Sequence, residues 1–302
     1  MRSLLAFLPL ALLACSEGGA TSRRPGEVRV LATTGMVADL ARVIGGDRVA
    51  VDALMGAGVD PHLYKASAGD LDRLRAADLV LCNGCMLEGK MQDQLLKLGR
   101  NKPVVAVTES VAPERLLEPP ELSGHYDPHV WFDVALWSET TAAVAGALAG
   151  VDPAHAAEYE ERGARYRAEL LELHKEVKEA IAAIQKERRV LITSHDAFRY
   201  FGRAYDIEVM GLQGISTVSE AGVQDVQRIV ETVVSRRVKA IFIETSVSPK
   251  NIEAVQVAAR EKGHEVKIGG TLYSDAMGDR PPEDTYVGMV RANVRTLVEA
   301  LR

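Results

Sequence analysis

The amino-acid sequence predicts an α/β protein with two four-stranded parallel-sheet lobes joined by one long backbone helix. Two observations predict the lobes: short β-branched runs alternate with amphipathic segments over residues 27–151, and the same alternation returns over residues 189–302. A third observation predicts the helix, because residues 152–188 form a polar stretch with a narrow apolar stripe. Strands that alternate with helices in this way form parallel sheets with helices on both faces.

The first predicted lobe covers residues 27–151. Its short apolar runs have the length and β-branched composition of buried strands, and the segments between them have helical periodicity. The predicted strands cover residues 28–32, 49–54, 79–82 and 104–107. The predicted helices lie near residues 36–44, 67–76 and 87–98, and an alanine-rich stretch at 133–150 closes the lobe.

A single linking helix is predicted over residues 152–188. Asp152 can cap its start, and Pro153 suits the first helical position because no amide hydrogen bond is lost there. Apolar residues recur along the helix at steps of three, four or seven: Tyr159, Tyr166, Leu170, Leu173, Val177, Ile181 and Ile184. At about 1.5 Å per residue such a helix would reach roughly 50 Å. We therefore expect it to run along both lobes.

The second predicted lobe covers residues 189–302 and repeats the pattern of the first. The predicted strands cover residues 190–193, 208–212, 240–243 and 265–268. The predicted helices lie near residues 196–205, 219–236, 249–262 and 283–302. Ser219 and Pro249 are suitable starts for two of these helices.

The first 26 residues have the pattern of an export signal and a tether. The apolar run at residues 4–14 would cover only about 16 Å as a helix, too short for a hydrocarbon core of about 30 Å. The sequence Leu12-Leu13-Ala14-Cys15 resembles the lipobox of bacterial lipoproteins. This resemblance implies a signal peptide at residues 1–14 and a lipid on Cys15, with residues 15–26 as a flexible tether. The alternative is an uncleaved leader with a chance cysteine.

Composition sets broad limits on the class of protein. The chain has 302 residues and a formal net charge of −6, and this acidic balance offers nothing that would attract nucleic acid. Because 47% of the residues are hydrophobic, the chain can bury one large core or two moderate cores. Two lobes fit this composition best.

Candidate metal ligands lie just after predicted strands. His62 and His129 each end an Asp-Pro-His sequence, His195 follows the strand at 190–193, and Asp275 lies beyond the last strand. Ligands in open α/β sheets bind outside the carboxyl ends of the strands, so these four side chains are candidates for one site. In Asp-Pro-His the proline fixes one torsion and the aspartate can hydrogen-bond local amides, which aims the imidazole. Three imidazoles and one carboxylate match the ligands that borderline divalent cations prefer.

Other polar residues have plainer explanations. A lone histidine is more often a surface or satisfied core residue than a ligand, and this applies to His155 and His174 on the predicted long helix and to His264 beside a strand start. His125, in the same loop as the second Asp-Pro-His, is either an outer or transient partner of the site or a solvent-exposed residue. Glu244, at the end of a strand, is either a partner of a ligand or a surface charge.

Two cysteines form a Cys-Asn-Gly-Cys sequence at Cys82 and Cys85. In an exported protein this pattern can be a disulfide, a thiol pair or a redox motif. Because a CxxC sequence alone is weak evidence for redox chemistry, a structural pair, with a possible disulfide, is the preferred interpretation.

The order and wording of these segments resemble the solute-binding lipoproteins of zinc and manganese ABC importers, and in particular their TroA-like branch. The resemblance covers the chain from about Val28 to its end. It rests on these segments: Val59-Asp60-Pro61-His62-Leu63-Tyr64, Asn83-Gly84, Asp127-Pro128-His129-Val130-Trp131, Thr193-Ser194-His195-Asp196-Ala197-Phe198, Gly211-Leu212-Gln213-Gly214 and Gly269-Gly270-Thr271-Leu272-Tyr273-Ser274-Asp275-Ala276.

The resemblance implies a helical-backbone metal receptor that hands Zn²⁺ or Mn²⁺ to a membrane permease and its ATPase. It also implies that His62, His129, His195 and Asp275 are the metal ligands, one pair from each lobe. The chain departs from the family at Cys82 and Cys85, where such proteins usually carry other residues. It also lacks, at residues 117–124, the His-rich insertion of many zinc-specific relatives.

These features together predict a monomeric, lipid-anchored binding protein of the cell envelope, periplasmic or on the outer face of the cytoplasmic membrane, and not an enzyme. Four protein ligands fill a tetrahedral shell and leave no position for an activated water. Zinc outranks manganese in intrinsic affinity for such ligands, while a bidentate Asp275 would suit manganese better.

Two enzymes are the rival interpretations. An exported zinc-dependent hydrolase would need an open coordination position and a general base such as Glu244. A serine hydrolase built on Ser194, His195 and Asp196 is excluded, because consecutive residues cannot line up as nucleophile, base and orienting group.

Overall fold

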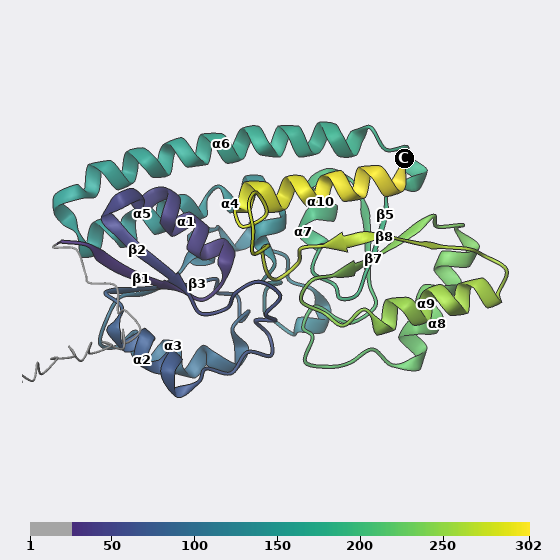
Figure 1. Ribbon diagram of the computed structural model, residues 1–302, viewed down its shortest axis with the longest axis horizontal. Coiled ribbons are helices and arrows are strands. Elements are labelled where there is room, and N and C mark those ends of the chain that lie inside the picture. The colour runs from purple at the N-terminus through teal and green to yellow at the C-terminus, as the bar shows by residue number, and fades with distance from the viewer. Residues whose placement is uncertain (1–25) are drawn as a thin grey trace, which may run out of the picture.

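The computed structural model describes residues 26–302 as two α/β halves that lie end to end beneath one long helix (Figure 1). The predicted signal peptide, the predicted lipidation site Cys15 and nearly all of the predicted tether lie outside these residues. The predicted fold class, α/β with parallel strands and a long backbone helix, is confirmed.

The first half is built on a four-stranded parallel sheet in the order β2-β1-β3-β4. Its strands are β1 (Val28–Ala32), β2 (Val49–Ala53), β3 (Leu79–Cys82) and β4 (Val104–Ala106). Its helices are α1 (Gly35–Gly45), α2 (Ala68–Ala76), α3 (Gln92–Leu98), α4 (Val134–Trp137) and α5 (Thr140–Val151). Helices α1 and α5 cover one face of the sheet and α2 and α3 the other (Figure 1). The strands are therefore buried on both sides, which explains their continuous apolar runs.

The second half contains the four predicted strands but not the predicted four-stranded sheet. Its strands are β5 (Val190–Thr193), β6 (Glu208–Gly211), β7 (Ala240–Glu244) and β8 (Lys267–Leu272). Its helices are α7 (Arg199–Tyr205), α8 (Val223–Ser235), α9 (Lys250–Glu261) and α10 (Tyr286–Leu301). Within the described residues, backbone hydrogen bonds pair β5 with β6 and β7 with β8, which gives two parallel two-stranded sheets.

Two local features lie where a continuous ladder between β5 and β7 would run. The two strands are neighbours, but the amide of His195, after the end of β5, donates to the side chain of Glu244 at 2.8 Å. The register of β7 against β8 also shifts between Ile241 and Ile243. At this point a side-chain hydrogen bond and an irregular strand therefore replace some of the backbone hydrogen bonds that a four-stranded sheet would have between β5 and β7.

Strand β8 begins and ends further along the chain than the predicted strand at 265–268. The prediction ended too early because the centre of the strand is Gly269-Gly270. A Cβ at Gly269 would meet the ring of Phe242 at 2.6 Å, and Gly270 has a φ of +142°. The close packing of β8 on β7 and α10 therefore requires glycine. These residues interrupt the β-branched pattern by which a strand is recognised in sequence.

Helix α6 covers Ala156–Ala182 and is shorter than the predicted 152–188. Short 3-10 turns flank it at Pro153–His155 and Lys186–Arg188. At about 1.5 Å per residue its 27 residues span about 40 Å. The guanidinium of Arg189 donates to the carbonyl of Ala182 at 3.0 Å and to that of Ile184 at 3.0 Å, so a residue beyond the helix caps its last carbonyl and holds the turn that follows.

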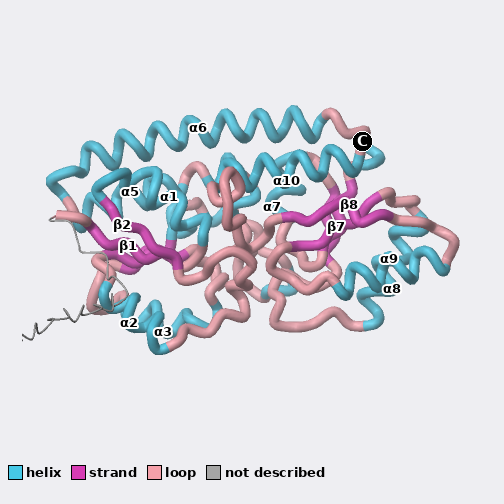
Figure 2. Tube along the Cα trace, viewed as in Figure 1, coloured by secondary structure: helices cyan, strands magenta, loops and turns pink. Residues whose placement is uncertain are grey.

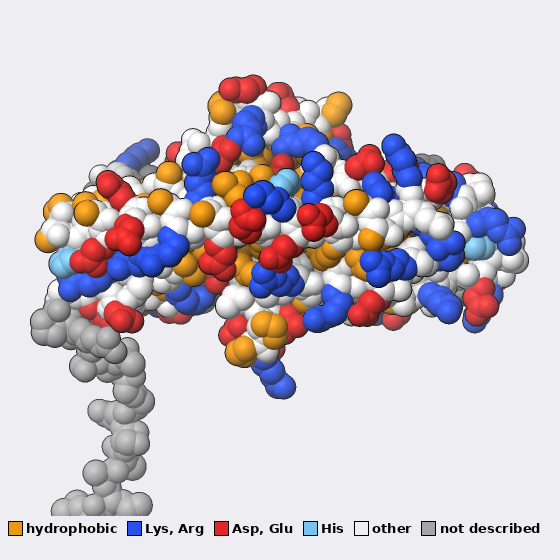
Figure 3. Space-filling view, turned by 90° about the horizontal axis from the view of Figure 1, so that it is seen from above, with side chains coloured by type: hydrophobic (Ala, Val, Ile, Leu, Met, Phe, Trp, Pro, Cys, Tyr) orange, Lys and Arg blue, Asp and Glu red, His pale blue; other side chains and the backbone are white. Residues whose placement is uncertain are grey.

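The expectation that this helix runs along both halves is confirmed. In the first half the hydroxyl of Tyr166 donates to Asp39 of α1 at 2.6 Å, and in the second half Glu176 pairs with Arg291 of α10 at 2.9 Å. The predicted apolar stripe is buried and belongs to one apolar cluster that extends from α1 through α6 to α7 and α10. The outer face of α6 carries interspersed acidic and basic side chains (Figure 3).

One described stretch, Val134–Val151, has the length and hydropathy of a membrane span. It is divided between α4 and α5, and α5 packs along α6 in the core. Gly163 of α6 allows this close approach, because a Cβ there would lie 3.2 Å from that of Ala145. The stretch is therefore a core element of this fold.

Loops gather at the centre of the molecule, between the two halves (Figure 2). The strands of both halves end toward this centre (Figure 1). Loops that follow β2, β4, β5 and β8 therefore meet in one place, as expected for a ligand site in an α/β protein.

Candidate metal centre

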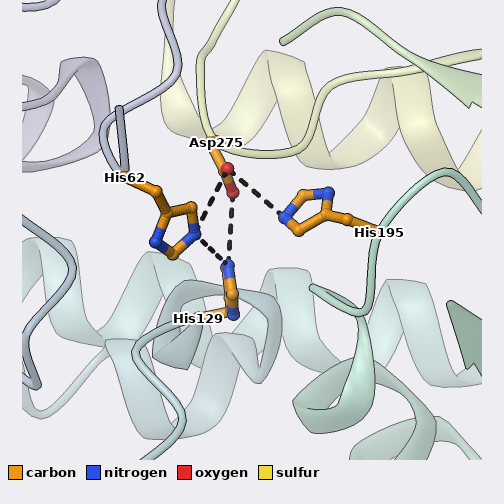
Figure 4. A group of neighbouring side chains, drawn as sticks. All are labelled: His62, His129, His195 and Asp275. Carbon is orange, nitrogen blue, oxygen red and sulfur yellow. Dashed lines mark hydrogen bonds and ion pairs between the residues drawn. The ribbon is translucent and has the colours of Figure 1, made fainter. Parts of the chain in front are cut away.

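The four predicted side chains come together between the two halves (Figure 4). His62 and His129 come from the loops after β2 and β4, and His195 and Asp275 from the loops after β5 and β8. One donor atom from each lies within 4.8 Å of the others, and no other such group of three or more His, Cys, Asp or Glu is found in residues 26–302. All four residues are at least 95% buried. The geometric expectation from sequence is met.

The donor atoms face a common point. Asp275 Oδ2 lies 3.3 Å from His195 Nε2 and 3.7 Å from His62 Nε2, and Asp275 Oδ1 lies 3.4 Å from His129 Nε2. His62 Nε2 and His129 Nε2 are 3.3 Å apart. In the described residues, both oxygens of Asp275 and Nε2 of His195 are buried without a hydrogen bond of acceptable geometry. Buried polar atoms without partners are rare, and here several point to the same small space.

Two of the three rings are held by carboxylates behind them. Asp127 accepts from Nδ1 of His129 at 2.8 Å and from its backbone amide at 3.0 Å. Glu244 in the same way accepts from Nδ1 of His195 at 2.5 Å and from its amide at 2.8 Å. A carboxylate that binds Nδ1 fixes the tautomer and leaves Nε2 as the ligand atom. Glu244 is therefore a partner of His195, the first of its two sequence interpretations.

The third ring, His62, is held differently. Asp60 accepts from the backbone amide of His62 at 2.8 Å but not from its ring. The other oxygen of Asp60 accepts from the hydroxyl of Thr217, in the loop between β6 and α8, at 2.6 Å. Within residues 26–302 the Nδ1 atom of His62 has no hydrogen-bond partner.

The loop of Asp275 is attached to the loop of His129. The indole nitrogen of Trp131 donates to the carbonyl of Ser274 at 3.2 Å, and the Trp131 ring packs edge-on against His129 with centroids 5.2 Å apart. Asn83 donates to the carbonyl of Pro128 at 3.0 Å from the other side. The residues next to two donor groups are therefore fixed by buried hydrogen bonds.

The charges of the site are set by these partners. Burial would lower the pKa of both clamped rings, but Asp127 and Asp275 raise the pKa of His129 to about 9. Glu244 and Asp275 raise the pKa of His195 well above its ordinary value. Burial, with the neighbouring imidazoles, lowers the pKa of His62 to about 4. Burial opposes ionisation of Asp275, but His195 and His129 hold its pKa well below its ordinary value.

The raised pKa values favour the protonated forms of His129 and His195, and the lowered pKa of Asp275 favours its carboxylate form. A divalent cation that entered this space would compete with protons for the Nε2 atoms of these two rings. Ring nitrogens and a carboxylate are donors that zinc and other borderline divalent cations accept. The arrangement is chemically suited to hold one such ion.

The remaining histidines lie outside this group. His125 is exposed, the second of its two sequence interpretations. His155 contacts Asp152 at 3.0 Å, His174 contacts the hydroxyl of Tyr205 at 3.2 Å, and His264 contacts the carbonyl of Val238 at 2.8 Å. Each of these three has a local structural role.

The possible disulfide between Cys82 and Cys85 is not present, and both residues are free thiols. The Cys82 thiol donates to the carbonyl of Val105 at 3.7 Å, while the Cys85 thiol donates to Oγ1 of Thr108 at 3.4 Å. The left-handed backbone at Cys85, with a φ of 50°, accompanies this separate orientation. Burial raises the pKa of the Cys85 thiol to about 11, which makes it a poor nucleophile.

Sequence reasoning missed several contacts of the site. The Asp-Pro-His pattern indicated an aspartate bonded to a local amide, which both loops contain, but it did not distinguish the ring contact of Asp127 from the Thr217 contact of Asp60. The role of Trp131 was also missed, although its place two residues after His129 was a usable signal.

The geometry of the site does not favour either of the two enzyme interpretations, the zinc-dependent hydrolase or the serine hydrolase. Both oxygens of Glu244 accept hydrogen bonds from His195, so this carboxylate is not free to act as a general base. Nδ1 of His195 faces Glu244 and its Nε2 faces Asp275, so neither ring nitrogen is paired with Ser194.

The chain is similar in sequence and in structure to known metal-binding proteins. It is 45% identical over 297 residues to the manganese-binding lipoprotein MntA of Bacillus subtilis, covering 98% of this chain and 97% of that protein. It is 46% identical over 285 residues to the zinc-binding protein TroA of Treponema pallidum, covering 94% and 92%. The solved structure of that periplasmic protein matches with a TM-score of 0.89 over 91% of this chain and 99% of that chain.

A family model gives the same assignment over almost the whole described fold. The model of ZnuA, described as zinc-uptake complex component A, periplasmic, matches residues 30–300, which contain all four converging side chains. The chain therefore belongs to the ZnuA family of periplasmic metal-uptake components.

Proposed function

We propose that this protein captures one divalent metal ion, Zn²⁺ or Mn²⁺, through His62, His129, His195 and Asp275, and delivers it to an ABC importer. The observation that carries the proposal is the convergence of four buried donor groups, with both oxygens of Asp275 and Nε2 of His195 lacking hydrogen-bond partners in the described chain. Family membership supports the same role, since the similar proteins are named for the metals that they bind.

The metal is not decided by the relatives, because two of nearly equal similarity are named for manganese and for zinc. Three imidazoles and a carboxylate give zinc the higher intrinsic affinity. Both oxygens of Asp275 face the histidines, so a bidentate contact with a larger, five-coordinate ion such as manganese is sterically available. We propose that the site binds both ions and holds zinc more tightly.

The protein is proposed to bind and not to catalyse. Four protein groups that surround one ion leave no coordination position for an activated water. The only carboxylate that ends a strand beside His195 is Glu244, and it is engaged by that histidine in the described structure.

Delivery requires partners and a location. We propose that the chain is cleaved after residue 14, lipidated at Cys15 and tethered by residues 15–26 to a membrane surface in the cell envelope, where the permease and its ATPase receive the ion. The name lipoprotein of the Bacillus subtilis relative supports this proposal. The functional unit is then a monomer with lobes at 27–151 and 189–302 and the linker at 152–188. Replacing Cys15 with Ala should release the protein from membranes.

A competition titration tests the ligand assignment. The protein lacking its first 25 residues would be stripped of metal and titrated with Zn²⁺ and Mn²⁺ against a chromophoric chelator of known affinity. We expect one tight site in the wild type and at least about 100-fold weaker binding in His129→Ala, since even partners behind a ligand contribute 10–100-fold. His174→Ala is the matched control and should bind as the wild type does. Unchanged affinity in His129→Ala would refute the assignment.

A further inference from the structure

We infer that Thr217 is a positioning residue for His62, and that its hydrogen bond to Asp60 couples the contact between the two halves to completion of the metal site. This inference rests on the proposed function, because it assigns the control of one ligand of that same site. The hydroxyl of Thr217 donates to Asp60 and not to a proposed ligand, so Thr217 acts through Asp60.

The contact joins the two halves beside the site. Asp60 lies two residues before His62 in the first half, and its Oδ1 accepts from the His62 amide at 2.8 Å. Its Oδ2 accepts from Oγ1 of Thr217 in the second half at 2.6 Å. One carboxylate thus connects the backbone of a proposed ligand to the opposite half of the molecule.

His62 depends on this connection more than the other two rings depend on contacts between the halves. The ring of His129 is fixed by Asp127 in its own loop, and the ring of His195 by Glu244 in its own half. The hydroxyl of Tyr200 also bonds the His129 loop across the halves, but at the backbone carbonyl of Asp127, which leaves the carboxylate on the ring. In residues 26–302 no side chain holds Nδ1 of His62.

Thr217 is buried although the residues that follow it are exposed. It is 6% exposed, while the next residue, Val218, is 61% exposed, and Ser219 and Glu220 are also exposed. Thr217 is therefore the last buried residue before the exposed part of this loop, and its hydroxyl is directed at Asp60. A threonine hydroxyl directed at a carboxylate forms a charge-assisted hydrogen bond, which is stronger than a neutral one.

A consequence follows for metal release. If the halves separate at this edge, the Thr217 hydroxyl leaves Asp60, and the loop of His62 loses its attachment to the second half. His129 and His195 keep their carboxylate partners in that event. His62 is then the first ligand to leave the ion, which opens a coordination position on the side of the first half.

The test uses variants of the full described chain, with His62→Ala as the spectroscopic reference for loss of that ligand. Thr217→Val removes the hydroxyl and keeps the shape, and Thr217→Ser restores a hydroxyl. The matched control is Thr245→Val, because Thr245 is half-buried in the second half and its hydroxyl has no hydrogen-bond partner in residues 26–302. For each protein the rate of Zn²⁺ release to excess chelator is measured, together with the visible d–d absorption of the Co²⁺-loaded form, which reports the ligand set.

We expect Thr217→Val to release Zn²⁺ about tenfold faster, which corresponds to about 1.4 kcal/mol, because the charge-assisted hydrogen bond to Asp60 is lost. Its Co²⁺ spectrum should shift toward that of His62→Ala, and Thr217→Ser should restore both readouts. Thr245→Val should match the wild type.

Two outcomes overturn the inference: Thr217→Val with wild-type release and spectrum, or Thr217→Val and Thr245→Val with equal effects. A wild-type protein that binds neither Zn²⁺ nor Co²⁺ would instead refute the proposed function, so the two failures are distinguishable. A loss of folding in Thr217→Val would appear as a lost circular-dichroism spectrum, and Thr217→Ser against Thr245→Val then decides: release by Thr217→Ser slower than or equal to wild type supports the inference, and faster release overturns it.

Discussion

The two Asp-Pro-His loops have the same three residues and hold their histidines in different ways. In Asp127-Pro128-His129 the carboxylate bonds both the amide and the ring of the histidine, and all three residues are fully buried or nearly so. In Asp60-Pro61-His62 the carboxylate bonds the amide, but its second oxygen reaches Thr217 in the opposite half. In both loops the aspartate therefore fixes the backbone of the histidine. The second partner of the aspartate differs: it is the histidine ring in one loop and a residue of the opposite half in the other.

The difference in partners also separates the two rings in charge. The Asp127 carboxylate helps to raise the pKa of His129 to about 9, whereas burial lowers the pKa of His62, whose Nδ1 is not bonded to a carboxylate, to about 4. At neutral pH one ring of the metal-free protein holds a proton that a metal must displace, and the other does not. One loop thus supplies a firmly oriented ring that must lose a proton to bind a metal, and the other supplies a neutral ring that is less firmly held.

The largest expected effect is on pH dependence. The pKa of His129 is raised to about 9 and that of His195 is raised well above its ordinary value, so a metal must displace protons from these rings and affinity falls as the pH falls. We expect about two protons to be released per ion near pH 7, and an affinity loss of about 100-fold per displaced proton between roughly pH 8 and pH 6. Calorimetry in buffers of different ionisation enthalpy measures the proton count.

The same measurement sharpens the contrast between the loops. His129→Ala should release one proton fewer than the wild type, while His62→Ala should release as many, because His62 carries no proton above about pH 5. Equal proton counts in the two variants would contradict the charges assigned to the loops.

The next effect separates the two histidines by stability. Both alanine variants should bind metal at least about 100-fold more weakly. His129→Ala also leaves Asp127 as a buried carboxylate without its ring partner, which should cost about 3–5 kcal/mol of unfolding free energy in the metal-free protein. His62→Ala keeps the amide contact of Asp60 and should be far less destabilised. Urea unfolding followed by circular dichroism measures both, and equal destabilisation would break the comparison.

The third prediction concerns the aspartates themselves. Asp127→Asn should weaken metal binding by about 10–100-fold, because the carboxylate orients the ring and raises its basicity. Asp60→Asn should weaken binding by about tenfold at most, since the amide oxygen can still accept from His62 and only the charge-assisted bond to Thr217 is altered. Chelator competition at fixed pH gives both affinities. A larger loss in Asp60→Asn would reverse the proposed order.

The smallest expected effect on affinity comes from Asn83→Ala. Asn83 donates to the carbonyl of Pro128 in the His129 loop at 3.0 Å, and its loss leaves that buried carbonyl without this donor. We expect a cost of about 1–3 kcal/mol in unfolding free energy and less than tenfold in metal affinity. Thermal or urea unfolding beside the same competition titration measures the two. A loss of affinity as large as that in Asp127→Asn would show that this contact, and not the carboxylate, sets the His129 ring.

The convergence of the four side chains could be predicted from their positions along the chain. His62, His129, His195 and Asp275 each follow a strand, and in a parallel α/β arrangement the ends of such strands share one edge, so their convergence could be expected. The apolar stripe of α6 was likewise readable, because a helix that packs on one side shows that side in its sequence.

Features that depend on contacts between distant residues could not be read in this way. The end of α6 is fixed by Arg189, which caps carbonyls from outside the helix. The glycines of β8 are required by Phe242 and α10, so the strand lacks a strand-like pattern where it is most tightly packed. The two-stranded sheets of the second half and the Thr217 contact of Asp60 likewise arise from tertiary neighbours.

The most direct test is a crystal structure of the metal-loaded protein with anomalous data at the zinc or manganese edge. We predict one anomalous peak between the two halves, about 2.0–2.2 Å from Nε2 of His62, His129 and His195 and from the carboxylate of Asp275. A peak located elsewhere, or an ion bonded to fewer than three of these four side chains, would contradict the proposed metal centre.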